Sequence, residues 1–270
     1  MSSYPGVRHP GLMIWTPVVL VVGIATAGYW LTAFPTLTWW DNSEYSAAAV
    51  TLGVPHPPGS LLATIIGWLA AKLTPLASSL LTLNLLAGLL AGLTVGLICA
   101  LAFRLLTGMG PVRGRSHSQS ISVPAAIGTP VAAFAFAFGD TMWSYAVKFT
   151  PYVLTALFTA LILWAMLRWW REAEHRNAVR WLLVIAVLFG LDFSVHRTNL
   201  LLLPGLLFWV LLRRPHVLIS GRCWLLGLGG FVLALAFNML IIPLAASGPI
   251  LNMGDPSSFS RYWNYIALQQ

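Results

Sequence analysis

One stretch of the chain, from Trp39 to Leu62, gathers side chains that can take up or release a proton. Asp41 and Glu44 are three residues apart, so their carboxylates share one face if the segment is helical. The two tryptophans at its start are typical of a bilayer interface, where ionisable groups are costly and tend to be kept for a purpose. We predict Asp41 and Glu44 as catalytic residues, and His56, in a His-Pro-Pro-Gly sequence, as a substrate-binding residue.

The same residues also allow a structural interpretation. Asp41-x-x-Glu44 matches a capping box, in which the first side chain accepts a backbone N–H and the second reaches back to the first residue. Pro58-Gly59 is typical of a type II turn, and the residues before a proline tend to be extended. His56 would then be a turn or packing residue. The sequence leaves both interpretations open.

The remainder of the chain indicates which elements position these residues. Of its 270 residues, 58% are hydrophobic and 8% are charged, which is typical of a helical membrane bundle and not of a soluble domain. We predict an all-α integral membrane protein with about seven transmembrane helices, the first too long for a signal-peptide core and therefore retained. The apolar stretches are Gly11–Ala33, Leu80–Phe103, Pro124–Gly139, Tyr152–Leu167, the short Trp181–Leu191, Asn199–Leu212 and Trp224–Leu244.

Basic residues fall in alternate loops, which predicts the orientation by the positive-inside rule. Only Lys72, Lys148, Arg197 and Arg261 fall on the outer side. This places the N-terminus in the cytoplasm, the protein in the inner (cytoplasmic) membrane and the C-terminal tail on the periplasmic face. The net charge of +8 thus reflects orientation and not nucleic-acid binding, which would need clustered basic and aromatic residues. The inner set is Arg8, Arg104, Arg113, Arg115, Arg168, Arg171, Arg176, Arg180, Arg213, Arg214 and Arg222.

This orientation requires the stretch Ser60–Leu73 to stay on the outer side, since a crossing there would invert every later loop. At 14 residues it is short for a span. We therefore predict one outer loop over residues 35–79, with a short helix near Glu44–Leu52 and an interfacial or re-entrant helix near Leu61–Leu73. Residues 1–245 form a single bundle with a basic inner loop at 104–122, and residues 246–270 form an outer tail in which Trp263 and Tyr265 rest at the interface.

The other polar residues receive structural interpretations. Asp140 and Asp192 are each expected to pair with an outer cation such as Lys148 or Arg197. Cys99 and Cys223 match no metal or redox spacing and are expected to be packing residues. No Asp-x-Asp spacing is present, so we predict no metal site and no obligatory cofactor.

The sequence WDNSEY, followed by AAAVTLGVPHPPGS, resembles the signature of the protein O-mannosyltransferase-like membrane family, which belongs to the GT-C glycosyltransferases. Members typically read W-D-S-G-E-F and then A-A-x-x-L-G-x-P-H-P-P-G, close to what stands from Trp40 to Gly59. Weaker similarities follow at Ser144–Phe158, His196–Trp209 and Pro249–Ile266.

The resemblance implies a GT-C-like fold with a large outer loop after the first span. It also implies an inverting enzyme that passes a sugar from a polyprenyl-phosphate donor to a protein or glycan acceptor on the outer side, with Asp41 as the general base. A phosphate leaves as a stabilised anion, so such a reaction needs one base and a cationic cradle. His56, Lys148, His196 and Arg197 are the expected cradle.

Three positions depart from the family pattern: Thr150 stands where members usually have Glu, and Thr155 and Val195 stand where they have Asn. Members are also generally longer. These departures favour an alternative, in which the chain is a non-catalytic heptahelical structural or accessory subunit of a larger bacterial membrane complex of the respiratory or photosynthetic type. Retention of Asp41, Glu44 and the His-Pro-Pro-Gly sequence favours the transferase.

Overall fold

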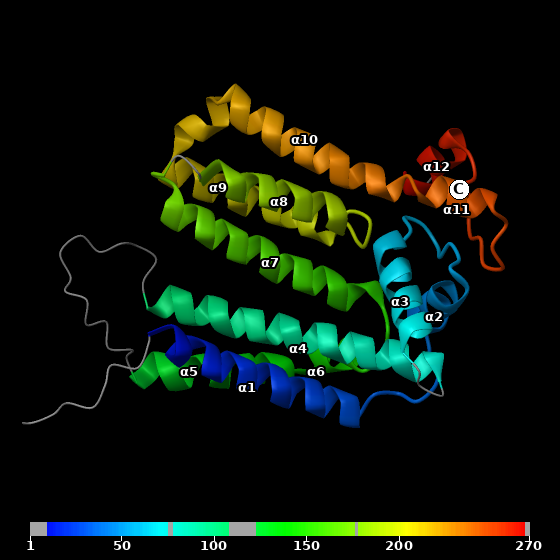
Figure 1. Cartoon of the computed structure of the whole chain (residues 1–270), viewed down its shortest axis with the longest axis horizontal. Coiled ribbons are helices and arrows are strands. Elements are labelled where there is room, and N and C mark those ends of the chain that lie inside the picture. Colours follow the sequence, from blue (N-terminus) through cyan, green and yellow to red (C-terminus); the bar gives the residue numbers. More distant parts are fainter. Residues whose placement is uncertain (1–9, 75–77, 108–122, 176–177, 268–270) are drawn as a thin grey trace, which may run out of the picture.

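The computed structural model describes residues 10–74, 78–107, 123–175 and 178–267, and its regular structure there is helical apart from one isolated bridge between Val54 and Asn252. The longer helices lie side by side, with α1, α4 and α5 at one edge of the bundle and α10 at the other (Figure 1). They are α1 (Pro10–Leu31), α4 (Ser79–Leu106), α5 (Val123–Ala137), α7 (Pro151–Glu172), α8 (Val179–Asp192), α9 (Leu203–Arg213) and α10 (Gly221–Asn238).

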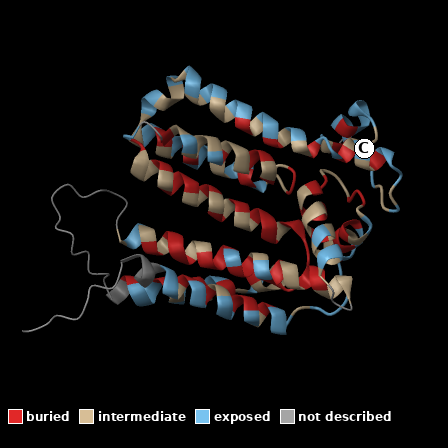
Figure 2. Ribbon diagram, viewed as in Figure 1, coloured by how far each residue is buried: buried red, intermediate tan, exposed pale blue. Residues whose placement is uncertain are grey.

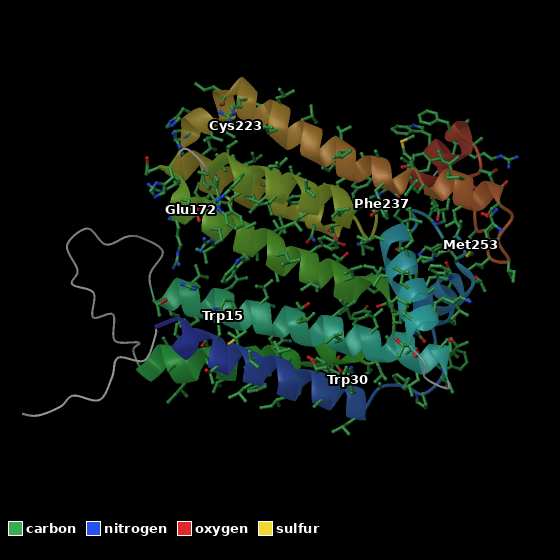
Figure 3. All side chains as sticks on the ribbon, in the orientation of Figure 1. Trp15, Trp30, Glu172, Cys223, Phe237 and Met253 are labelled. Atoms are coloured by element: carbon green, nitrogen blue, oxygen red, sulfur yellow. The ribbon has the colours of Figure 1, made fainter. Side chains whose placement is uncertain are left out.

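Short helices gather at one end of this bundle, which we call the site end. Helices α2 (Asp41–Thr51), α3 (Leu61–Leu73), α11 (Ile241–Ala246) and α12 (Phe259–Ile266) all lie there (Figure 1). The opposite end, which we call the arginine end, carries Glu172 and Cys223, whereas Phe237 and Met253 lie at the site end (Figure 3). The described arginines of the arginine end are Arg104, Arg168, Arg171, Arg180, Arg213, Arg214 and Arg222.

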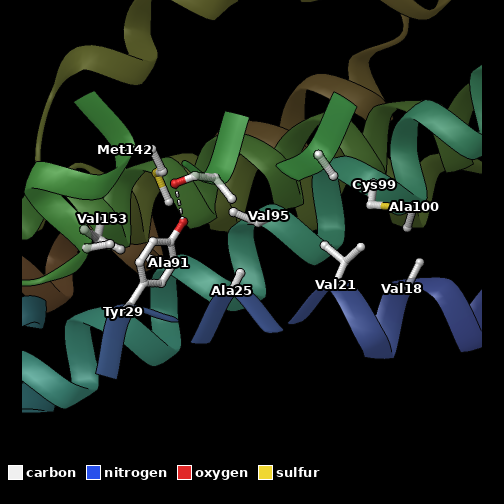
Figure 4. Packing of buried hydrophobic residues seen from close by; sticks show 13 residues of the cluster. Val18, Val21, Ala25, Tyr29, Ala91, Val95, Cys99, Ala100, Met142 and Val153 are labelled. Carbon is white, nitrogen blue, oxygen red and sulfur yellow. Dashed lines mark hydrogen bonds between the residues drawn. The ribbon is translucent and has the colours of Figure 1, made fainter. Parts of the chain in front are cut away.

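The first half of the bundle packs around α4. Ala91 and Val95 of α4 and Ala25 of α1 are buried together, and Tyr29 of α1 donates its hydroxyl to the Ala137 carbonyl at 2.8 Å (Figure 4). Small residues at this contact let the two backbones approach closely, as is usual between membrane helices. This half ends in α5, which is followed after a bend of 65° by α6 (Asp140–Ala146).

The second half packs α7 against α8, α9 and α10. Trp169 and Met166 of α7 are fully buried in this cluster. Gly190 of α8 lies against α10 so closely that a Cβ atom there would stand 2.6 Å from the Ala234 Cβ and 2.7 Å from the Phe231 carbonyl oxygen. Buried residues line α4 and α7, whereas α1 and α10 expose one side (Figure 2).

Three described helices are long and apolar enough to cross a membrane: Ser79–Leu106, Pro151–Glu172 and the continuous stretch Gly221–Ala246. The bent α5–α6 pair adds a fourth if it forms one span, and three shorter apolar helices accompany them. The chain is therefore a helical protein with the spans of a membrane protein. A helix lies in each of the seven predicted stretches, while the count of seven crossings stays a prediction.

The region after α1 contains both of the short helices that we expected, although the first begins at Asp41 and not near Glu44. Figure 1 shows α3 running across the end of the bundle and not alongside the long helices. Helix α6 was not predicted. Most of the basic loop at 104–122 lies outside the described residues.

Candidate functional site

Asp41 opens α2, and its carboxylate points to another helix. Tyr152, the second residue of α7, donates its hydroxyl to Asp41 Oδ2 at 2.8 Å. The predicted capping box is wrong: Trp40 occupies the N-cap position, and it makes no side-chain cap hydrogen bond. Both carboxylates of the Asp-x-x-Glu pair are therefore available for contacts outside their own helix.

Glu44 holds the His-Pro-Pro-Gly turn. Its Oε1 accepts the His56 backbone N–H at 2.5 Å and lies 2.9 Å from His56 Nδ1. The other ring nitrogen, Nε2, lies 3.3 Å from the Tyr45 hydroxyl, and burial raises the pKa of Tyr45 to about 12, so that this hydroxyl stays protonated and can donate. Glu44 beside Nδ1 and Tyr45 beside Nε2 thus hold the His56 ring by a contact at each nitrogen. His56 is thus a turn residue with a fixed imidazole orientation. The predicted type II turn centred on Pro58-Gly59 is wrong, because Gly59 donates its backbone N–H to the His56 carbonyl at 3.0 Å, which makes Pro57 and Pro58 the central residues.

Aromatic rings connect Asp41 to two of the predicted cationic residues. The Tyr152 ring has Tyr145 at 5.0 Å between centroids and His196 at 5.3 Å. The Lys148 ammonium lies 5.4 Å from the centre of the Tyr145 ring, a cation–π distance. Asp41, Lys148 and His196, which come from three separate parts of the chain, are therefore grouped around two tyrosines.

His196 lies in the connection between α8 and the short helix η2 (Thr198–Leu202), and its Nδ1 lies 2.5 Å from the Thr198 hydroxyl. Burial lowers the pKa of His196, and the nearby Arg197 lowers it further. The imidazole is therefore neutral at pH 7. We expected His196 as part of a cationic cradle, but it offers a ring face and a hydrogen-bonding nitrogen, not a charge.

The Arg197 side chain packs against a different aromatic ring. Its guanidinium lies 4.9 Å from the centre of the Phe193 ring, and burial lowers its pKa, while Tyr262 of α12 acts in the opposite direction. Of the six predicted site residues, Asp41, Lys148 and His196 are thus grouped around Tyr152 and Tyr145, Glu44 and His56 contact each other, and Arg197 contacts Phe193.

Two buried asparagines fix α2 against α4 and the start of α7. Asn42 donates its amide to the Phe149 carbonyl at 3.0 Å and to Asn84 Oδ1 at 3.3 Å, and it accepts the Thr38 backbone N–H at 2.8 Å. Asn84 in turn accepts the Phe149 backbone N–H at 2.8 Å. Because Asn42 follows Asp41 and Phe149 precedes Tyr152 by three residues, this network sets the distance between the carboxylate and its tyrosine.

A second set of contacts fixes the segment between α8 and η2, which carries His196. Ser60 donates its hydroxyl to the Val195 carbonyl at 2.9 Å, and Leu62 donates its backbone N–H to the Ser194 carbonyl at 3.2 Å. The N-terminus of α3, directly after the His-Pro-Pro-Gly turn, is thereby joined to the residues that carry His196.

The predicted pairing of Asp192 with a cation is wrong. Asp192 is buried and accepts hydrogen bonds from the neutral donors Thr155 Oγ1 at 3.0 Å and Asn199 Nδ2 at 2.7 Å. Asp140, an exposed residue, forms no ion pair among the described residues either. Thr155, one of the departures from the family pattern, therefore has a defined partner inside the bundle.

The tail after α11 packs onto the His56 turn. Met253 donates its backbone N–H to the Val54 carbonyl at 3.0 Å, and the Tyr265 hydroxyl donates to the Pro55 carbonyl at 2.5 Å. Tyr265 is thus buried, whereas we expected it at a membrane interface, and Trp263 is exposed. A cleft of about 720 Å³ lies between the turn and the tail, lined by His56, Pro57, Met253, Gly254, Asp255, Arg261, Asn264 and Tyr265.

Sequence reasoning missed the residues that assemble the site, namely Tyr152, Tyr145, Asn42 and Asn84. Asn84 lies inside an apolar helix, and a polar side chain there is a recognisable signal. Tyr152 gave no such signal, since tyrosine at a helix end is also an ordinary bilayer anchor. The described residues contain no group of three metal-ligating side chains, and the absence of an obligatory metal stays a prediction.

Apolar spans with a cluster of carboxylate, tyrosine and imidazole groups at one end define a helical membrane protein with a polar site beside the bilayer. Residues 41–219 match the family model described as Protein O-mannosyl-transferase TMEM260 N-terminal domain, so the chain belongs to this family and is a glycosyltransferase-like membrane protein. The match begins at Asp41 and contains all six predicted site residues.

One similar protein is Protein O-mannosyl-transferase TMEM260 of Mus musculus, which is 27% identical over 195 residues. The match covers 72% of this chain and 25% of the mouse protein, so the chain corresponds to about a quarter of its relative. No solved structure matches.

Proposed function

We propose that the protein is a GT-C-type membrane glycosyltransferase that moves a sugar, with inversion, from a polyprenyl phosphate to a hydroxyl group of an acceptor at the site end. Mannose and a protein acceptor are the first pair to test, because the mouse relative is named a protein O-mannosyl-transferase. The site end faces the periplasm in this proposal, since the basic residues gather at the opposite end.

The observation that carries the proposal is the hydrogen bond from Tyr152 to Asp41, within a chain whose family match begins at that aspartate. A base for this reaction must be a fixed carboxylate within reach of the acceptor hydroxyl. The tyrosine occupies one carboxylate oxygen, Oδ2, and leaves Oδ1 to receive the acceptor proton.

The other groups have distinct roles in this proposal. The Lys148 ammonium supplies positive charge toward the departing phosphate, and neutral His196 donates or accepts a hydrogen bond beside it. The Glu44–His56 pair shapes the turn that faces the cleft between the outer loop and the tail. No step needs a metal, because a lipid phosphate leaves as a stable anion.

The test is a transfer assay with the purified chain, or the longer protein that contains it, and a polyprenyl-phosphate-linked mannose. Asp41→Asn should lower transfer by about 10²- to 10⁴-fold, the usual contribution of a general base. Tyr152→Phe should lower it by about 10- to 100-fold, since hydrogen bonds to charged groups contribute about 1.5–3 kcal/mol. Both variants should still unfold in a cooperative transition, which separates the loss of transfer from a loss of the fold.

Asp140→Asn is the matched control, because Asp140 is an exposed aspartate at the start of α6 that forms no ion pair among the described residues. Its transfer rate should equal that of the parent. Transfer by Asp41→Asn at the parental rate would refute the assignment of the base. If the parent transfers no sugar from any polyprenyl phosphate, the non-catalytic subunit becomes the better interpretation.

A further inference from the structure

A group of buried polar side chains lies beside the segment that carries His196. We call it the Asp192 network: Asp192 ends α8, Asn199 lies in η2, and Thr155 and Thr159 lie on α7. Asp192 accepts the Thr155 hydroxyl on Oδ1 at 3.0 Å and the Asn199 amide on Oδ2 at 2.7 Å. The Asn199 amide also donates to the Thr155 carbonyl at 3.3 Å, and its oxygen accepts the Thr159 hydroxyl at 2.5 Å. Each polar atom of the carboxylate and of the amide therefore has a partner from another element.

The network encloses His196 on both sides in the sequence. Before it, the Asp192 carbonyl accepts the backbone N–H groups of Val195 and His196, each at 2.8 Å. After it, Asn199 attaches the start of η2 to α7. Thr198 presents its backbone N–H and its hydroxyl to His196 Nδ1, at 3.3 Å and 2.5 Å. The imidazole is thus held by a segment whose two ends are both attached to the network.

The same face of α7 carries the ring that His196 contacts. Tyr152, Thr155 and Thr159 are three and four residues apart, a spacing that places side chains on one face of a helix. Thr155 anchors the network. Tyr152, one turn earlier, packs on the imidazole with 5.3 Å between ring centroids and donates to Asp41. The network therefore sets where the His196 ring meets the residue that holds the carboxylate.

The contacts with α3 hold a different part of this segment. Leu62 and Ser60 donate to the carbonyl groups of Ser194 and Val195, and both contacts end before His196. The side-chain hydrogen bonds that join η2 to α7 come from the network instead. The position of the imidazole therefore depends on the network even where α3 stays in place.

A buried carboxylate is a costly way to fill this space. Removing a carboxylate from water costs free energy that hydrogen bonds to neutral donors return only in part, and a leucine of similar branched shape would pack there without that cost. Hydrogen bonds are directional, however, and a fully satisfied network specifies one arrangement of the groups that it joins. The network therefore fits a requirement for a defined geometry better than a requirement for stability.

We propose that Asp192 and Asn199 are positioning residues of the site: they hold the His196 ring against Tyr152 and thereby fix the hydroxyl that binds Asp41. Neither residue touches a reacting group. A displacement of about 1 Å at a reacting group can lower a rate by about 10²-fold, so a network one step removed can control the rate. The role in sugar transfer rests on the proposed function, whereas the control of the ring contact does not.

Fluorine NMR of the full chain in detergent, with fluorotyrosine in place of its seven tyrosines, reports the ring contact without any transfer. The Tyr152 signal is assigned by its loss in Tyr152→Phe, and His196→Ala shows where it moves when the imidazole is absent. Asp192→Leu and Asn199→Leu remove the hydrogen bonds and keep a branched side chain, and Asp192→Asn keeps an acceptor for Asn199. Asn238→Leu is the matched control, because Asn238 is a buried asparagine of α10 whose amide has no hydrogen-bond partner among the described residues.

The Tyr152 signal should move in Asp192→Leu and in Asn199→Leu in the direction found for His196→Ala, while Asp192→Asn and the control should leave it at the parental position. The Tyr29 signal should stay in place in every variant, because Tyr29 lies in the other half of the bundle. A Tyr152 signal that stays in place in Asn199→Leu would overturn the proposal, as would a shift in Asp192→Asn equal to that in Asp192→Leu. If Asp192→Leu does not fold, Asn199→Leu and Asp192→Asn decide.

Transfer kinetics separate positioning from binding. Asn199→Leu should lower kcat by about tenfold or more and change KM by less than about twofold, because the network touches neither substrate. A loss confined to KM, or an unchanged kcat, would overturn the positioning role in transfer. If the parent transfers no sugar but the Tyr152 signal shifts as expected, the ring contact is confirmed and the proposed function fails. Transfer by a parent whose Tyr152 signal does not respond to Asn199→Leu supports the function and overturns this inference.

Discussion

Replacing Asn42 by alanine tests whether the buried amide network positions the site. In the parent protein Asn42 is 1% exposed and satisfies the Thr38 backbone N–H and the Phe149 backbone carbonyl. Asn42→Ala leaves both groups without this partner. Each unsatisfied buried polar group costs about 1–3 kcal/mol, so the free energy of unfolding should fall by about 2–6 kcal/mol. We expect a fall of about 3 kcal/mol, because water or a shifted backbone can satisfy some of the hydrogen bonds that Asn42 made.

That loss can be measured as a melting temperature in detergent. For a chain of this size a change of 1 kcal/mol shifts the midpoint by about 2–4 °C, so Asn42→Ala should melt about 6–12 °C below the parent. Asn264→Ala is the matched control, because Asn264 is exposed in α12 and its side chain forms no hydrogen bond among the described residues. A melting temperature for Asn42→Ala within about 2 °C of this control would refute the argument that the amide network holds α2 in place.

Two further predictions concern packing and pH. Gly190→Ala should destabilise the protein by about 1–3 kcal/mol, because the new Cβ would collide with the α10 backbone. Gly229→Ala on α10 is the control and should be neutral or stabilising by up to about 1 kcal/mol. Equal melting temperatures of the two variants would contradict the α8–α10 contact. Burial lowers the pKa of His196 below its ordinary value of 6.5, so the unfolded chain binds the proton more readily and stability falls as the pH drops through 6.5. The melting temperature of His196→Asn should therefore fall less steeply between pH 8 and pH 5 than that of the parent. An equal slope would contradict the lowered pKa.

The sequence predicted the features that follow from composition and periodicity. The helices in the seven apolar stretches, the two short helices after α1 and the grouping of basic residues at one end all come from the cost of placing polar groups in a bilayer. The bend between α5 and α6 was missed, because Phe138 and Gly139 continue an apolar run that reads as the end of one span.

The site was predicted less completely. Asp41, Glu44 and His56 could be selected because they are polar residues next to a predicted span, yet their partners could not. Tyr152 is 111 residues from Asp41, and nothing in local spacing relates the two. The capping box was wrong for the same reason: a local pattern suggested a local partner, and a distant helix supplied a better one. Asp192 likewise pairs with Thr155 and Asn199 because burial favours neutral donors over a charged one that would itself need desolvation.

The hydrogen bonds from the tail to the His56 turn have a consequence for biosynthesis. Val54 and Pro55 depend on Met253 and Tyr265, about two hundred residues later in the chain. During translation, the turn leaves the ribosome long before its partners exist. The helices around α4 can pack first, but the wall that faces the cleft is completed only after the later residues have been synthesised. A nascent chain halted before α11 would therefore have the first helices in place and an unfinished site end.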